Sequence, residues 1–103
     1  MLYKLRKEQV MKVVKLDRRH RLFRRGMTYA IKFENDWDRQ LRVEHALTDM
    51  HGWGYNNKNW DTFRGKVKIN RDRREYADGR VHIYWIGVRN PADLTMVMLK
   101  ING

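Results

Sequence analysis

The feature that most restricts the fold is a pair of extended runs joined by Asp78-Gly79. Asp-Gly favours a two-residue hairpin turn, because these residues accept the positive backbone angles that such a turn requires. With this turn Ala77 pairs with Arg80, and counting outward places Ile69 opposite Val88. The sequence therefore predicts an antiparallel hairpin on either side of residues 78–79.

Side chains alternate along a strand, so the predicted hairpin has two different faces. The first face is apolar and is expected to be core: Val67, Ile69, Tyr84, Ile86 and Val88. The second combines cations with aromatic and aliphatic groups: Lys66, Lys68, Arg74, Tyr76, Val81, Ile83 and Trp85. We interpret the second face as a binding surface or as a half-covered second core.

Two further strands are expected in the N-terminal third. Residues 10–16 (VMKVVKL) contain three valines, whose branched side chains favour a strand, although a helix is the alternative. Residues 27–33 (MTYAIKF) alternate between apolar and other side chains, which is typical of a strand.

One helix is expected between these strands and the hairpin. Asp36 is suited to cap a helix, and apolar residues recur at helical spacing from Trp37 to His51 before Gly52. Residues 53–63 then predict a loop whose aromatic rings mostly close the end of the core, with stacking on bases as the alternative.

The last run, residues 94–101, is apolar on both faces when read with a period of two. It follows Asn90-Pro91, and it predicts a strand inside the sheet. The fold class is therefore α+β: an antiparallel sheet of about four to five strands with one main helix (residues 37–51) packed on one face. At 103 residues the chain, residues 1–103, is expected to form a single small basic domain.

The charge of the chain indicates a polyanionic partner. The formal net charge is +11, and residues 1–32 hold 11 Lys/Arg against 2 Asp/Glu. Such an excess suits DNA, RNA, an anionic membrane surface or an acidic protein. No window approaches a membrane span, and the N-terminus lacks the apolar core of a secretory signal, so a soluble cytoplasmic protein is expected.

Several kinds of chemistry are disfavoured by what the chain lacks. It contains no cysteine and no serine, and no glycine loop of a nucleotide-binding type. His45, Asp49 and His51 have ligand-like spacing, but helix capping explains them better than a metal site. We expect no cofactor and no metal, and we favour binding over catalysis, with an unrecognised nuclease as the enzymatic alternative.

Two clusters of cations are the candidate binding residues. Arginine offers a planar fork that matches phosphate oxygens, and an exposed aromatic ring stacks on unpaired bases. We therefore predict a small protein that binds DNA or RNA largely without sequence choice. The candidate nucleic-acid-binding residues are Arg18, Arg19, Arg21, Arg24, Arg25, Lys66, Lys68, Arg71, Arg73, Arg74, Tyr76 and Trp85.

The alternative function is a small regulator or assembly protein, of the compact kind that viruses encode, which binds an acidic protein partner. Charge would then steer the encounter, and a buried aromatic or arginine side chain would supply most of the affinity. A homodimer is also an alternative if residues 94–101 form an edge strand.

Overall fold

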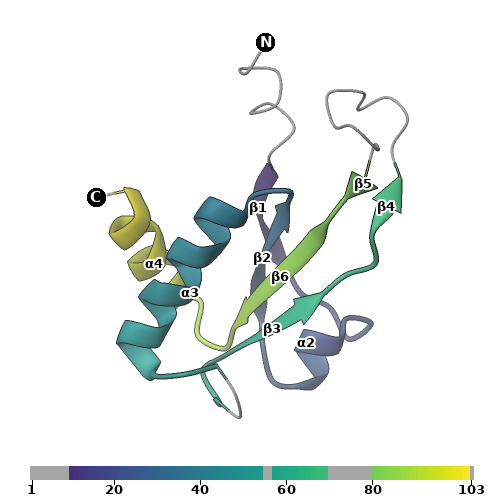
Figure 1. The fold of residues 1–103 in the computed structure, drawn as a ribbon. Coiled ribbons are helices and arrows are strands. Elements are labelled where there is room, and N and C mark those ends of the chain that lie inside the picture. Colours follow the sequence, from purple (N-terminus) through teal and green to yellow (C-terminus); the bar gives the residue numbers. More distant parts are fainter. Residues whose placement is uncertain (1–9, 55–56, 70–79, 103) are drawn as a thin grey trace.

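The computed structural model describes residues 10–54, 57–69 and 80–102 (Figure 1). At its centre is an antiparallel sheet with the strand order β1-β2-β6-β3. Its strands are β1 (Val10–Lys15), β2 (Tyr29–Glu34), β6 (Ile83–Val88) and β3 (Trp60–Arg64). The α+β class with an antiparallel sheet is therefore confirmed, as are the strands predicted in residues 10–16 and 27–33.

Helices lie on both sides of the sheet. Figure 1 shows α3 (Trp37–His51) and α4 (Ala92–Asn102) together on one side, and the short α2 (Arg21–Arg24) on the other. We call the sheet face under α3 and α4 the core face. Its buried cluster joins the central strands to both helices: Ile31, Phe33, Val43, Ala46, Leu47, Trp60, Ile86, Val88 and Val97.

The helix predicted at residues 37–51 is confirmed, with its expected ends. The Asp36 carboxylate accepts a hydrogen bond from the Arg39 backbone N–H at 3.2 Å, which satisfies one of the free donors of the first turn. At the other end Gly52 has φ +85° and donates its N–H to the Thr48 carbonyl at 2.8 Å. Glycine adopts this backbone angle without steric cost, so the helix ends here.

The strand predicted at residues 94–101 is wrong, because this segment is the helix α4. Asn90 Oδ1 accepts from the Ala92 N–H at 3.0 Å, Pro91 precedes the first turn, and Asp93 lies within it. These are helix-start signals. The apolar side chains that pack on the core face recur at helical spacing, and a short apolar run satisfies both periods: Leu94, Val97, Met98 and Ile101.

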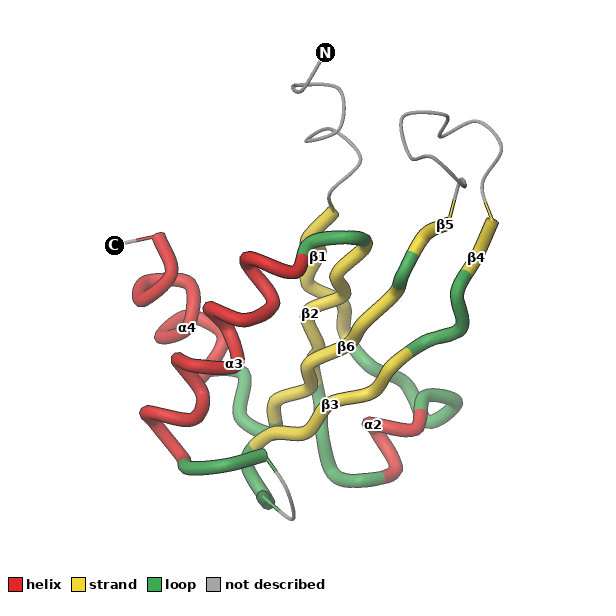
Figure 2. The backbone as a smooth tube through the Cα atoms, in the orientation of Figure 1, coloured by secondary structure: helices red, strands yellow, loops and turns green. Residues whose placement is uncertain are grey.

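The predicted hairpin exists, but its register is wrong. The short strands β4 (Lys68–Ile69) and β5 (Arg80–Val81) pair so that Ile69 lies opposite Arg80, whereas Val88 lies opposite Trp60. β6 pairs instead with β2 and with β3, and β3 lies in the segment that was predicted to be a loop. The turn predicted at residues 78–79 lies outside the described residues. In Figure 2, β4 and β5 continue the direction of β3 and β6 away from the sheet.

The aromatic residues in the segment predicted to be a loop, residues 53–63, occupy different environments. Trp60 closes the core as predicted, since it is 4% exposed and its indole Nε1 donates to the Gly52 carbonyl at 3.0 Å. Trp53 does not close the core, because 81% of it is exposed. Phe63 lies on the opposite face of the sheet from α3, and Tyr55 lies outside the described residues. In the part of the chain that the structure describes, no helix has the length and apolar character of a membrane span.

Asn35 joins the end of β2 to the point where β5 and β6 separate. Its backbone N–H donates to the His82 carbonyl at 3.0 Å. Its side-chain Nδ2 donates to the Arg80 carbonyl at 3.2 Å, and its Oδ1 accepts from the His82 N–H at 2.8 Å. Asn35 is buried and has φ 52°, a left-handed angle that asparagine tolerates better than most residues.

Two substitutions separate the hydrogen bonds of Asn35 from its backbone angle. Asn35→Gly keeps the left-handed angle but leaves the partners of the side chain unpaired, which costs about 1–3 kcal/mol of unfolding free energy. Asn35→Ala loses the same hydrogen bonds and also strains the backbone, so it is expected to be less stable than the glycine variant by about 1 kcal/mol. Urea unfolding followed by circular dichroism measures both. Equal stability of the two variants would contradict a role for the backbone angle.

Candidate nucleic-acid interface

A line of two lysines and two aromatic residues crosses the sheet on the side of α2. The strand register places Lys12 of β1 opposite Lys32 of β2, Lys32 opposite Trp85 of β6, and Trp85 opposite Phe63 of β3. Residues directly opposite each other in antiparallel strands project from the same face of a sheet. We call this line of four residues the cross-strand row, and the sheet face that carries it the α2 face.

The aromatic rings of the row hold cations close to the sheet. Lys32 Nζ lies 5.3 Å from the centre of the Trp85 ring, and Arg21 Cζ lies 5.5 Å from the centre of the Phe63 ring. His20 sits edge-on against both rings, with centroid distances of 4.6 Å to Trp85 and 5.6 Å to Phe63. A cation is attracted to the electron-rich face of a ring, so these contacts limit the motion of Lys32 and Arg21.

The helix α2 approaches the sheet over two small residues. Ala30 and Gly87 lie opposite each other, and Leu22 and Met27 pack above them in a second buried cluster. A Cβ atom at Gly87 would lie 3.0 Å from Met27 Cγ and 3.1 Å from Leu22 Cδ1, so these two side chains would have to shift to admit a larger residue. The close approach brings Arg21 within reach of Phe63.

His20 is the N-cap of α2. Its Nδ1 accepts a hydrogen bond from the Leu22 N–H at 3.1 Å, and this requires an unprotonated Nδ1. Burial lowers the pKa of His20 below its usual 6.5, because the charged imidazolium loses hydration, while the carboxylate of Asp17 acts weakly in the opposite direction.

The five arginines of residues 18–25, which were predicted to bind nucleic acid, make different contacts in the structure. Arg21 joins the cross-strand row through Phe63. Arg25 forms an ion pair with Asp61 of β3 at 2.8 Å, and Arg19 pairs with Asp17 at 3.1 Å, where its hydrogen bonds hold the pKa of that carboxyl below its usual value. The remaining two, Arg18 and Arg24, are exposed, and Arg24 Nε donates to the Arg18 backbone carbonyl.

The second predicted cluster is described only in part. Trp85 lies in the cross-strand row, half-buried beside α2. Lys66 is exposed in the segment between β3 and β4, and Lys68 begins β4. The other members lie outside the described residues, so their part in the site stays a prediction: Arg71, Arg73, Arg74 and Tyr76.

Sequence reasoning missed four residues of this interface: Lys12, Lys32, Phe63 and His20. The signal for the two lysines was available, since each alternates with apolar neighbours inside a predicted strand. Their alignment with the aromatic rings was not available, because it depends on how four strands pair.

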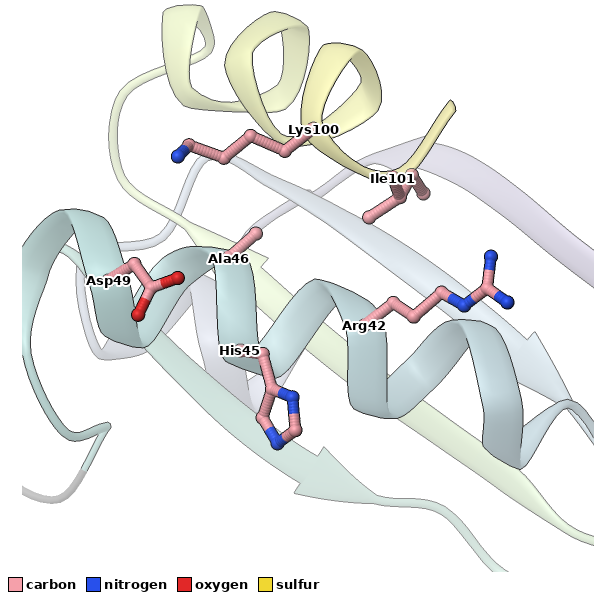
Figure 3. A pocket seen from close by; sticks show the side chains of 6 residues that line it. All are labelled: Arg42, His45, Ala46, Asp49, Lys100 and Ile101. Atoms are coloured by element: carbon pink, nitrogen blue, oxygen red, sulfur yellow. The ribbon is translucent and has the colours of Figure 1, made fainter. Parts of the chain in front are cut away.

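A second group of cations lies between α3 and α4, but its charges do not converge. Arg42, His45, Asp49 and Lys100 line a hollow of about 520 Å³. Figure 3 shows the Lys100 amine on the side of Asp49, while Arg42 extends the other way and the His45 ring points away from α4. Arg42 also pairs with Asp38 at 3.3 Å.

His51, the third residue of the group with ligand-like spacing, interacts with Asp93 and not with His45 or Asp49. His51 Nε2 lies 2.9 Å from Asp93 Oδ2 of α4, so His51 links α3 to α4. Among the described residues no three side chains of the types that bind metal ions come together.

The chain was compared with protein-family models, with curated protein sequences and with solved structures. None of the three comparisons finds a significant match.

The cap at His20 predicts a pH dependence of stability. Because the folded-state pKa is lowered, the contribution of His20 is present above its usual pKa of 6.5 and is lost as the pH falls through the folded-state value. The unfolding free energy is therefore expected to begin to fall as the pH drops below about 6.5 and to continue falling until His20 is protonated in the folded state. His20→Asn retains an N-cap acceptor but does not titrate, so its unfolding free energy should fall less below pH 6.5. Identical pH profiles for the two proteins would contradict the assignment.

Proposed function

We propose that this protein binds nucleic acid along the sugar-phosphate backbone, and that the α2 face is the contact surface. The observation that carries the proposal is the direct pairing of Lys12 with Lys32. Like charges directly opposite each other destabilise a sheet, and neither lysine forms an ion pair with a carboxylate among the described residues. A bound phosphate would relieve this repulsion.

The charge balance around the row supports an anionic ligand. Arg21 adds a third cation, held over Phe63. Among the described residues, Asp17 and Asp61 lie on the α2 face or its border and are paired to arginines outside the row. Glu34 lies on the same face, toward the end of β2. The surface beside Lys12, Lys32 and Arg21 is therefore net positive.

The length of the row suits a short stretch of backbone. Four neighbouring strands about 4.8 Å apart span roughly 14 Å. This is the rise of about four nucleotides at roughly 3.4 Å each along one strand. The row therefore offers contacts to a few successive phosphates.

The same geometry argues for weak sequence choice. Trp85 is half-buried and its ring is already covered by Lys32, so a base would have to displace this side chain before stacking there. Phosphate contacts fix position and affinity but carry no sequence information directly. The proposal includes a location inside the cell, where DNA and RNA are found, and it leaves the choice of polymer to experiment.

Binding should depend on salt and on the lysines of the row. Fluorescence anisotropy would be measured with labelled oligothymidylate, oligouridylate and a mixed-sequence duplex over a series of salt concentrations. Removing both charges with Lys12→Ala/Lys32→Ala should weaken binding and reduce the slope of log K against log salt by about 1.4 for single strands, because each lost phosphate contact contributes about 0.7.

The control is Arg42→Ala/Lys100→Ala, which removes the same charge from the hollow between α3 and α4. This variant should keep the slope of the unchanged protein, and both variants should keep its circular dichroism spectrum. Equal losses in the two variants would show that net charge, and not the α2 face, governs binding. Absence of binding at low salt for all three ligands would refute the proposal.

A further inference from the structure

The outer edge of β1 has free hydrogen-bonding groups in the described structure. The Leu16 N–H donates to the Thr28 carbonyl, which continues the pairing of β1 with β2. Because backbone groups alternate in direction along a strand, the N–H and C=O groups of Met11, Val13 and Lys15 point away from β2. Within the described ranges β1 pairs with β2 alone, so these groups face outward.

An apolar groove runs beside this edge, between β1 and α4. It has a volume of about 480 Å³ and is lined by Val13, Leu94, Thr95, Met98, Leu99 and Asn102. Val13 is 46% exposed and Leu99 is 64% exposed, so the groove presents aliphatic surface to solvent. Val13 also lies on the core face of the sheet, opposite Ile31.

We propose that the edge of β1 binds an extended segment of an acidic partner protein, which adds to the sheet as a further antiparallel strand. Edge strands recognise peptides in this way: main-chain hydrogen bonds supply affinity, and alternate side chains enter pockets that supply specificity. Here the outward groups at Met11, Val13 and Lys15 are the main-chain partners, and the groove beside Val13 is the pocket.

The charges at the edge define the partner. Lys12 and Lys15 are both exposed, on opposite faces of β1. In an antiparallel arrangement the segment would place acidic residues opposite these lysines and apolar residues opposite Val13 and Met11. From its N-terminus to its C-terminus, the partner segment would therefore have the five-residue pattern acidic, any, apolar, acidic, apolar.

A second copy of this chain suits the edge less well. Pairing two β1 edges about a twofold axis at Val13 would bring Lys12 of each copy to diagonal positions on one face, where their charges repel. The chain also carries a net charge of +11, which opposes self-association. An acidic partner removes both costs.

This binding site shares Lys12 with the proposed nucleic-acid contact, but its other parts lie elsewhere. It uses the outward edge of β1 and the groove on the core face, whereas the cross-strand row lies on the α2 face. Variants at Val13, Lys15 and Leu99, which lie outside the cross-strand row, should therefore leave nucleic-acid binding unchanged if that proposal holds. Tests at these three residues distinguish failure of one proposal from failure of the other.

The test uses a synthetic peptide, Glu-Thr-Val-Glu-Val with blocked ends, and a matched peptide with Lys in place of Glu. Binding to the full chain would be followed by NMR of the amide signals of residues 11, 13 and 15. Val13→Pro removes an outward N–H without touching the bonds to β2 and should weaken binding about tenfold. Leu99→Asp should weaken it as well, by placing a charge in the groove.

A charge exchange gives a result that misfolding cannot imitate. Lys15→Glu should lose affinity for the acidic peptide and gain affinity for the lysine peptide. Three outcomes would overturn the proposal: no binding of the acidic peptide at millimolar concentration, equal binding by Val13→Pro, or a dimer in sedimentation experiments that Val13→Pro dissociates. The last outcome would assign the edge to a second copy of the chain.

Discussion

The close approach of α2 to the sheet is the contact on which the proposed interface depends. It is possible because Ala30 and Gly87, opposite each other in the two central strands, leave space for Leu22 and Met27. This contact sets the height of α2 above the sheet and so brings Arg21 to Phe63 and His20 to Trp85. The ion pair between Arg25 and Asp61 ties the end of the same short helix to β3.

The side chains of the central strand β6 alternate between the two faces of the sheet. This alternation lets one strand contribute both to the buried core and to the charged α2 face. Ile86 and Val88 point into the core under α3 and α4, while Trp85 and Gly87 face α2. Trp85 also has a role on the α2 face, because its ring holds the Lys32 amine in place. Prearranged cations lose less conformational freedom on binding an anion than free lysines do.

Sequence reasoning located elements better than it paired them. Local signals identified α3 correctly, since Asp36 and Gly52 mark its ends, and valine content identified β1. The strand predicted at residues 94–101 was wrong because the apolar side chains from Leu94 to Ile101 satisfy both a period of two and the helical period, whereas the Asn90-Pro91 start signal favours a helix. The hairpin register was wrong because it depends on Trp60 entering the core opposite Val88, a contact between distant segments. The candidate site followed this pattern: Arg21 and Trp85 were found, while their alignment with Lys12 and Lys32 required the pairing of the whole sheet.

The strand order has a consequence for how the protein comes into being. β2 pairs with β6, and Tyr29 lies opposite Val88. This pairing cannot form until the chain has been synthesised as far as β6. Such distant pairing slows folding, because a long segment of chain must be ordered before the contact forms. During synthesis, the basic first third therefore leaves the ribosome before β6, the strand that places Trp85 beside Lys32. If the protein binds polyanions as proposed, charge alone would govern any binding before the last third of the chain has joined the sheet, and the geometry of the α2 face would contribute only afterwards.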